Sequence, residues 1–164
     1  MTSSPDAERD LLRHTLATLA YRAGKAVRGA PESFATYRIS RAEKTRTPEA
    51  ILAHVGDLMD WALSLVRGSH AWKDSAPLPW EQEVARFFEA VRRLDGALAS
   101  TDPLGCPAGR LFQGPIADAL THVGQIAMLR RLAGAPVKGE NYYKADIAAG
   151  RVGPDQAPPR VEFE

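Results

Sequence analysis

The chain has 164 residues, which is enough to bury a substantial hydrophobic core in a single domain. Its 21 basic and 20 acidic residues leave a formal net charge of +1, so charge gives no reason to expect a nucleic-acid or membrane partner. The single cysteine, Cys106, excludes an internal disulfide and a thiolate zinc cluster, and its Gly-Cys-Pro setting predicts a loop.

The first apolar segment is interrupted by Arg13, His14 and Arg22. It therefore predicts neither a secretory signal nor a membrane-spanning helix. We expect a cytoplasmic protein, with residues 1–164 forming one domain.

Proline stands at the start of four amphipathic segments, a position that suits its fixed backbone angle and missing amide hydrogen. Their apolar residues recur at helical spacing and predict helices over about 5–28, 48–67, 79–100 and 115–133. The expected N-caps are Ser4, Thr47 and Gly114, and the expected stops are Gly29, Gly68 and Gly134. The predicted core positions are Leu12, Leu16, Leu19, Ala23, Val27, Ile51, Val55, Leu58, Ala62, Leu65, Val84, Phe87, Phe88, Val91, Leu94, Leu98, Ile116, Leu120, Val123 and Ala127.

The predicted connections over 29–46, 68–78 and 101–114 are longer than those that usually join antiparallel helices. About eleven extended residues reach about 36 Å, which is enough to run the length of a bundle. We therefore predict an all-α fold, a four-helix bundle with long or crossover connections. A short extra C-terminal helix is expected over about 144–149, followed by an irregular tail over 150–164 that wraps the surface.

A polar stripe opens the fourth predicted helix. Asp118 and His122 are four residues apart, so on a helix they lie one turn apart on the same face and can bind one ion together. Gln125, Leu129 and Leu132 share this arc, which is polar over its first two turns and apolar over its last two. We interpret the arc as an inward-facing stripe that lines a pocket at its polar end and packs at its apolar end.

His54 occupies a comparable position on the second predicted helix, on the same core-facing arc as Leu58 and Trp61. A histidine there needs a partner. On this helix alone, a core imidazole that is hydrogen-bonded to a neighbour is the simpler interpretation. The alternative is a metal ligand that completes a set of three with Asp118 and His122.

Ordinary structural roles also exist for the other residues. The helix dipole favours a carboxylate such as Asp118 in the first turns, and Gln125 can be a buried or rim amide. The residues alone therefore leave both a metal site and plain polar helix faces open. His14 and His70 are expected to be exposed and are not assigned to the site.

Two segments resemble the DinB-like (DinB/YfiT) superfamily of four-helix metalloproteins. One is 47–58, TPEAILAHVGDL, which contains His54. The other is 118–126, DALTHVGQI, in which His-x-Gly-Gln is the most specific part. The resemblance covers most of the chain, from the first predicted helix to about Gly134.

The resemblance implies a divalent metal, often nickel or zinc, held by three side chains near the bundle centre. By motif position His54 is the first ligand and His122 the third, and Asp118 stands where many members have histidine. The thiol-dependent maleylpyruvate isomerase branch is similar in having a carboxylate there, although it is the longer glutamate. Coordination by Asp118 through a water molecule therefore stays open beside direct coordination. The resemblance also implies a homodimer.

Two functional hypotheses follow. The first is a metal-dependent enzyme that uses a low-molecular-weight thiol in S-transfer, as better understood members of the superfamily do, with a small-molecule substrate. In it, Gln125 supports the ligands or packs beside them, and residues 142–144 either help to close the pocket or, more simply, pack on the surface. The second hypothesis is a non-enzymatic helical bundle, metal-bound or metal-free, that dimerises through an apolar helix face and serves as an interaction or stress-response module.

Overall fold

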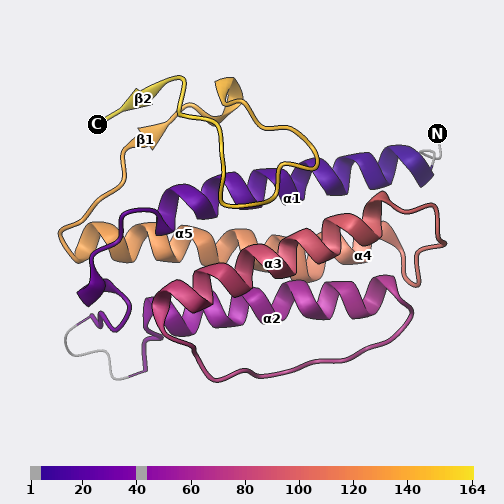
Figure 1. The fold of residues 1–164 in the computed structure, drawn as a ribbon, viewed down its shortest axis with the longest axis horizontal. Helices are drawn as coiled ribbons and strands as arrows, with labels where there is room; N and C mark the ends of the chain where they lie inside the picture. The colour runs from indigo at the N-terminus through magenta and orange to yellow at the C-terminus, as the bar shows by residue number, and fades with distance from the viewer. Residues whose placement is uncertain (1–4, 40–43) are drawn as a thin grey trace.

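Four long helices lie side by side in the computed structural model, which describes residues 5–39 and 44–164 (Figure 1). They are α1 (Pro5–Val27), α2 (Pro48–Val66), α3 (Trp80–Ala99) and α5 (Ala117–Leu132). Short elements accompany them: η1 (Glu32–Phe34), α4 (Ala108–Leu111), η2 (Phe112–Ile116), β1 (Gly139–Glu140), η3 (Tyr142–Lys144) and β2 (Glu162–Phe163). The predicted all-α bundle is confirmed. No helix in the described ranges has the length and apolar character that a bilayer span requires.

The connection between α2 and α3 is a crossover. Helices α1 and α2 each pack against both α3 and α5, which places α1 and α2 at opposite corners of the bundle. In Figure 1, α2 and α3 run in the same direction, and the segment between them returns along the whole length of α2. The connection over residues 68–78 therefore runs the length of the bundle, as its length predicted.

The core is built from the predicted apolar stripes. The stripes of α1 and α3 are buried except for Val84, which is half-buried. Burial of each leucine side chain contributes about 2 kcal/mol to the stability of the fold. The half-buried members on the other helices are Leu65, Leu120 and Ala127. Residues between the stripes complete the core, including Phe34, Leu52, Met59, Leu111 and Ile126.

The helix ends follow the predicted signals except at the start of α3 and at the start of the fourth predicted helix, where the expected cap Gly114 lies inside η2. The side chain of Thr47 accepts a hydrogen bond from the backbone N–H of Ala50, and Pro48 is the first residue of α2. The three predicted stop glycines adopt the left-handed conformation, with φ of 61° at Gly29 and 76° at Gly68 and Gly134. Pro79 precedes the first helical residue of α3 instead of being that residue. The predicted cap Ser4 lies outside the described residues.

The start of the fourth predicted helix was wrong. The helical segment begins at Ala108, seven residues before Pro115, which lies inside the π-helical turn η2. There the backbone N–H of Ala117 donates to the carbonyl of Phe112, five residues earlier. Proline has no amide hydrogen for a normal helical bond, and the wider turn accommodates this defect without ending the helix.

The predicted C-terminal helix over 144–149 was also wrong. A single 3-10 turn, η3, ends at Lys144, the first residue of this range, and Gly150 at φ 87° ends an irregular segment. Six residues with one apolar side chain, Ile147, against the core do not offset the cost of helix nucleation. The tail remains irregular as predicted, except that β2 pairs antiparallel with β1.

A buried carboxylate fastens this C-terminal region to α1. The Tyr21 hydroxyl donates to Glu140 at 2.6 Å, and the Lys25 ammonium binds Glu140 at 2.8 Å and Glu162 at 2.7 Å. Tyr142 packs edge-on against Tyr21, with ring centroids 6.2 Å apart. Tyr142 therefore packs on the surface of α1, as the simpler prediction for residues 142–144 had it, whereas Tyr143 is 96% exposed.

Candidate metal centre

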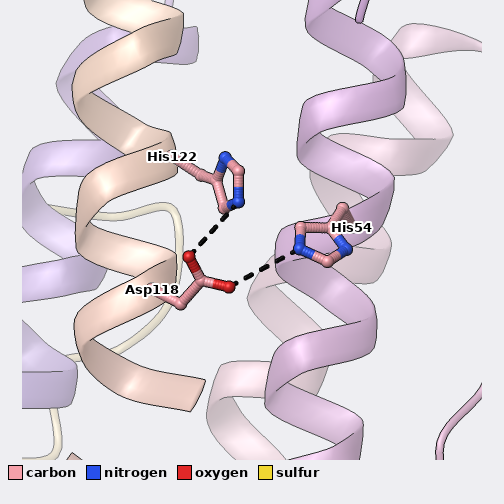
Figure 2. A group of neighbouring side chains, drawn as sticks. All are labelled: His54, Asp118 and His122. Carbon is pink, nitrogen blue, oxygen red and sulfur yellow. Dashed lines mark ion pairs between the residues drawn. The ribbon is translucent and has the colours of Figure 1, made fainter. Parts of the chain in front are cut away.

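Helices α2 and α5, which pack directly against each other, bring the three predicted ligands together. His54 comes from α2, and Asp118 and His122 come from consecutive turns of α5 (Figure 2). The π-helical turn η2 ends two residues before Asp118. Turns of this kind are frequent at functional sites because the extra residue changes which side chains face inward.

The carboxylate of Asp118 lies between the two imidazoles, as Figure 2 shows. One carboxylate oxygen is 3.4 Å from Nε2 of His122, and the other is 3.7 Å from Nε2 of His54. Both distances exceed the roughly 2.7–3.2 Å of an N–H···O hydrogen bond. The side chains of His54 and His122 are 17% and 15% exposed, and that of Asp118 is 47% exposed. Solvent therefore reaches the carboxylate much more easily than the two imidazoles.

The geometry fits one divalent ion with little adjustment. Donor atoms from the three side chains all lie within 4.8 Å of one another. Tetrahedral ligands that each bind zinc at about 2.1 Å lie about 3.4 Å apart. Both carboxylate–imidazole distances are near this value, and the widest separation would have to shorten by about 1.4 Å through side-chain rotation.

Gln125 determines which nitrogen of His122 is available. Its side-chain oxygen is 2.8 Å from Nδ1 of His122, and because an amide oxygen can only accept, Nδ1 must carry the proton. The lone pair of the neutral ring is then on Nε2, the nitrogen that faces Asp118. This arrangement is the usual support for a histidine metal ligand.

The environment of His54 favours its neutral form. Burial lowers the pKa of the imidazole, and the positive charges of Arg46 and of a protonated His122 lower it further, against a smaller opposing effect of Asp118. A neutral imidazole is the form that binds a metal. A permanent ion pair between His54 and Asp118 is correspondingly disfavoured at neutral pH.

Aromatic residues of the crossover cover His54 on one side. The Trp72 ring lies edge-on to His54 at 5.6 Å and to Trp61 at 5.9 Å, and His70 lies against Trp61 at 5.4 Å. Sequence reasoning missed Trp72, although a large aromatic residue in an otherwise polar loop was the available signal. His70 is exposed, as predicted, but belongs to this aromatic cluster.

A groove of about 760 Å³ adjoins the candidate centre. It is lined by both imidazoles, by Gln125 and Arg46, and by the apolar residues Ile39, Ile51, Met128 and Leu129, among others. Of the polar half of the predicted α5 arc, His122 and Gln125 therefore line a pocket, as expected, whereas Asp118 is not part of the lining. The apolar half is only partly inward, because Leu129 is buried whereas Leu132 is 51% exposed.

The crossover that carries Trp72 is held by two buried carboxylates. Asp57 accepts a hydrogen bond from the backbone N–H of Ser75, and Glu83 accepts one from that of Leu78. Arg86 binds both carboxylates and also donates to the carbonyl of Ala53, next to His54. This network joins α2, α3 and the crossover beside the candidate centre.

The remaining candidate residues do not reach the centre. His14 is exposed on α1, as predicted. Cys106 is half-buried, and burial raises the pKa of its thiol, which reduces the thiolate needed of a nucleophile.

Comparison of the chain with models of protein families, with curated proteins and with solved structures gave no match. The resemblance to the DinB-like superfamily therefore stays a prediction.

Proposed function

We propose that this protein is a DinB-like, divalent-metal-dependent enzyme that uses a low-molecular-weight thiol in S-transfer to a small-molecule substrate. In this proposal His54, Asp118 and His122 hold the ion. The observation that carries the proposal is that donor atoms of these three side chains lie within 4.8 Å of one another. The side chains come from two helices, α2 and α5, that are far apart in the sequence.

The donor set favours zinc or nickel. Imidazole suits both ions, whereas magnesium and calcium prefer sites built from oxygen ligands alone. Three protein ligands leave a position for water or substrate, which is typical of a catalytic site and not of a closed structural one. A bound ion would lower the pKa of a coordinated water or thiol and so supply a nucleophile near neutral pH.

The chain itself supplies orientation and access. Gln125 fixes the tautomer of His122, and Trp72 shields one side of His54. The groove beside the two imidazoles provides space for a thiol or a substrate. These features support an enzyme more than a bundle in which the histidines only pack.

Metal content tests the ligand assignment. Protein prepared without a metal-binding tag is expected to hold about one zinc or nickel ion per chain by elemental analysis. His122→Ala should remove the ion and keep the helical circular dichroism, because the side chain lies at the rim of the core. His14→Ala, on exposed α1 surface, is the matched control and should keep the ion. A metal-free wild type whose His122→Ala variant unfolds would make the histidines structural and remove the proposal.

Thiol chemistry is tested separately. Metal-loaded protein is expected to consume a bacterial low-molecular-weight thiol together with an electrophile, and the His122→Ala variant should not. Absence of turnover with every thiol, in protein that retains its ion, would contradict the S-transferase assignment. A metal-bound interaction module would then be the better description, and sedimentation velocity would test the homodimer that the resemblance implies.

A further inference from the structure

Arg46 adds a permanent positive charge to the groove beside the imidazoles. It directly precedes Thr47, the N-cap of α2, and its exposed side chain lines the groove. Its charge acts on His54, where it is one cause of the lowered pKa. None of the described residues that line the groove is aspartate or glutamate. The described lining is therefore positively charged.

The rest of the wall offers apolar surface. Ile51 and Leu129 are buried, but Ile39 and Met128 are 37% and 58% exposed. A ligand that covered these two side chains would remove apolar surface from water, which is the usual source of affinity in a small-molecule site.

The groove and the aromatic cluster approach His54 from opposite directions along α2. Ile51, one turn before His54, lines the groove, whereas Trp61, two turns after it, contacts Trp72. A ligand in the groove therefore reaches the imidazoles from the side of Arg46.

We infer that the groove binds a small anionic ligand, with a carboxylate or comparable group at Arg46 and an aliphatic portion against Ile39 and Met128. The inference rests on the proposed function, because the other end of the ligand then lies at the metal centre. Charge supports it. A divalent ion with two neutral imidazoles and one carboxylate keeps a single net positive charge, and Arg46 adds a second, so the combined field attracts anions. Arg46 is in this view a specificity-determining residue for the thiol or its acceptor.

Matched thiols test this inference by binding and not by turnover. The probes are a short series of ω-mercaptocarboxylates and the corresponding uncharged amides, titrated into cobalt(II)-loaded protein and followed by the thiolate-to-cobalt absorption band. The variants are Arg46→Gln and Arg67→Gln. Arg67 is also exposed and directly follows α2, so it repeats the charge change at the other end of the same helix, about 30 Å away.

The wild type is expected to bind at least one carboxylate about fivefold more tightly than its amide, and added salt should reduce the difference. Arg46→Gln should abolish this preference, and Arg67→Gln should keep it. Equal binding of acids and amides by the wild type, or a preference unchanged in Arg46→Gln, would overturn the inference but leave the metal centre intact. Failure of the protein to load cobalt, or of every thiol to produce the band, would instead remove the proposed function and this inference with it.

Discussion

His122 uses its two ring nitrogens for different purposes. Nδ1 donates to Gln125, and Nε2 faces the carboxylate of Asp118. The ring is therefore held in one orientation before any ion arrives, which lowers the entropic cost of binding. His54 packs edge-on against the rings of Trp72 and His122, with centroids 5.6 Å and 4.8 Å away, and is positioned by these ring contacts instead.

The lowered pKa of His54 gives the metal-free protein a defined response to acid. Between the depressed folded pKa and the ordinary value of 6.5, the unfolded chain binds a proton at this residue and the folded chain does not. Protons then favour unfolding. The free energy of unfolding should therefore fall as the pH drops through 6.5 toward the folded pKa, and His54→Gln should remove this part of the decrease.

Urea denaturation with a chelator present, compared between about pH 7.5 and pH 5.5, measures this effect. The slope against pH should be smaller in His54→Gln than in the wild type. Equal slopes would show that the imidazole is as easily protonated in the folded protein as in the unfolded chain.

The candidate ligands could be predicted because their signal is local. Asp118 and His122 are one helical turn apart, and His54 is a polar residue on an apolar stripe, so periodicity marked them as candidates. The resemblance to the DinB-like superfamily was needed to prefer metal ligands over plain polar helix faces. The positions of the Arg46 and Trp72 side chains could not be predicted, although an aromatic residue in a polar loop marked Trp72 as a candidate. Each lies in a connection, where no periodicity fixes the direction of a side chain, and each reaches the centre only through the path of the backbone.

The network around Arg86 holds three elements together, because it fixes a long connection, without helix or strand of its own, against α2 and α3. Asp57 and Glu83 have side chains that are 1% and 0% exposed, and both are paired with Arg86. Their other oxygens accept backbone hydrogen bonds from the crossover. The segment is thereby kept against α2 and α3.

Two arginines on α3 allow a controlled test of this network. Arg86 and Arg92 each pair with a glutamate three residues earlier, but only the partners of Arg86 are buried. Arg86→Ala leaves two buried carboxylates uncompensated and should reduce the free energy of unfolding by about 3–5 kcal/mol. Arg92→Ala should leave it unchanged within error, because both members of that pair are well exposed.

Chemical denaturation of the two variants measures the difference. Similar midpoints for Arg86→Ala and Arg92→Ala would contradict a stabilising role for the network.

Element boundaries were predictable where a single local signal decides them. Thr47 with Pro48 begins α2, and the left-handed Gly68 follows its last turn. Pro115 was misleading because the same residue suits a helix start and a π-helical turn, and only packing distinguishes the two. Leu111, buried one turn earlier, is a packing contact that keeps the helix continuous through the proline.

For the whole molecule, the C-terminal region acts as a brace on α1. Glu140 has a fully buried side chain that binds Tyr21 and Lys25, whereas Glu162 binds the same lysine but is 35% exposed. Burial of the Tyr21 hydroxyl and its hydrogen bond to Glu140 raise the pKa of this group, so it stays a donor. Neither the brace nor its partners line the groove or the candidate metal centre.

Replacement of Glu140 and replacement of Glu162 are therefore expected to have different effects on the free energy of unfolding and no effect on metal binding. Glu140→Ala removes the buried partner of the Tyr21 hydroxyl and the Lys25 ammonium. It should lower the free energy of unfolding by about 2–4 kcal/mol. Glu162→Ala should cost less than about 1 kcal/mol. Denaturation experiments give the costs, and elemental analysis of the folded variants should find the same metal content. Loss of the ion in Glu140→Ala would show that the brace and the centre are coupled.

His54 and Asp118 lie about sixty residues apart along the chain, and α3 is the long helix between them. An ion shared by α2 and α5 would clamp the two halves of the polypeptide and restrict the unfolded ensemble as a cross-link does. Proteases that cleave the opened chain would then act only after the ion has dissociated. The lifetime of the protein in the cell would consequently follow the supply of metal.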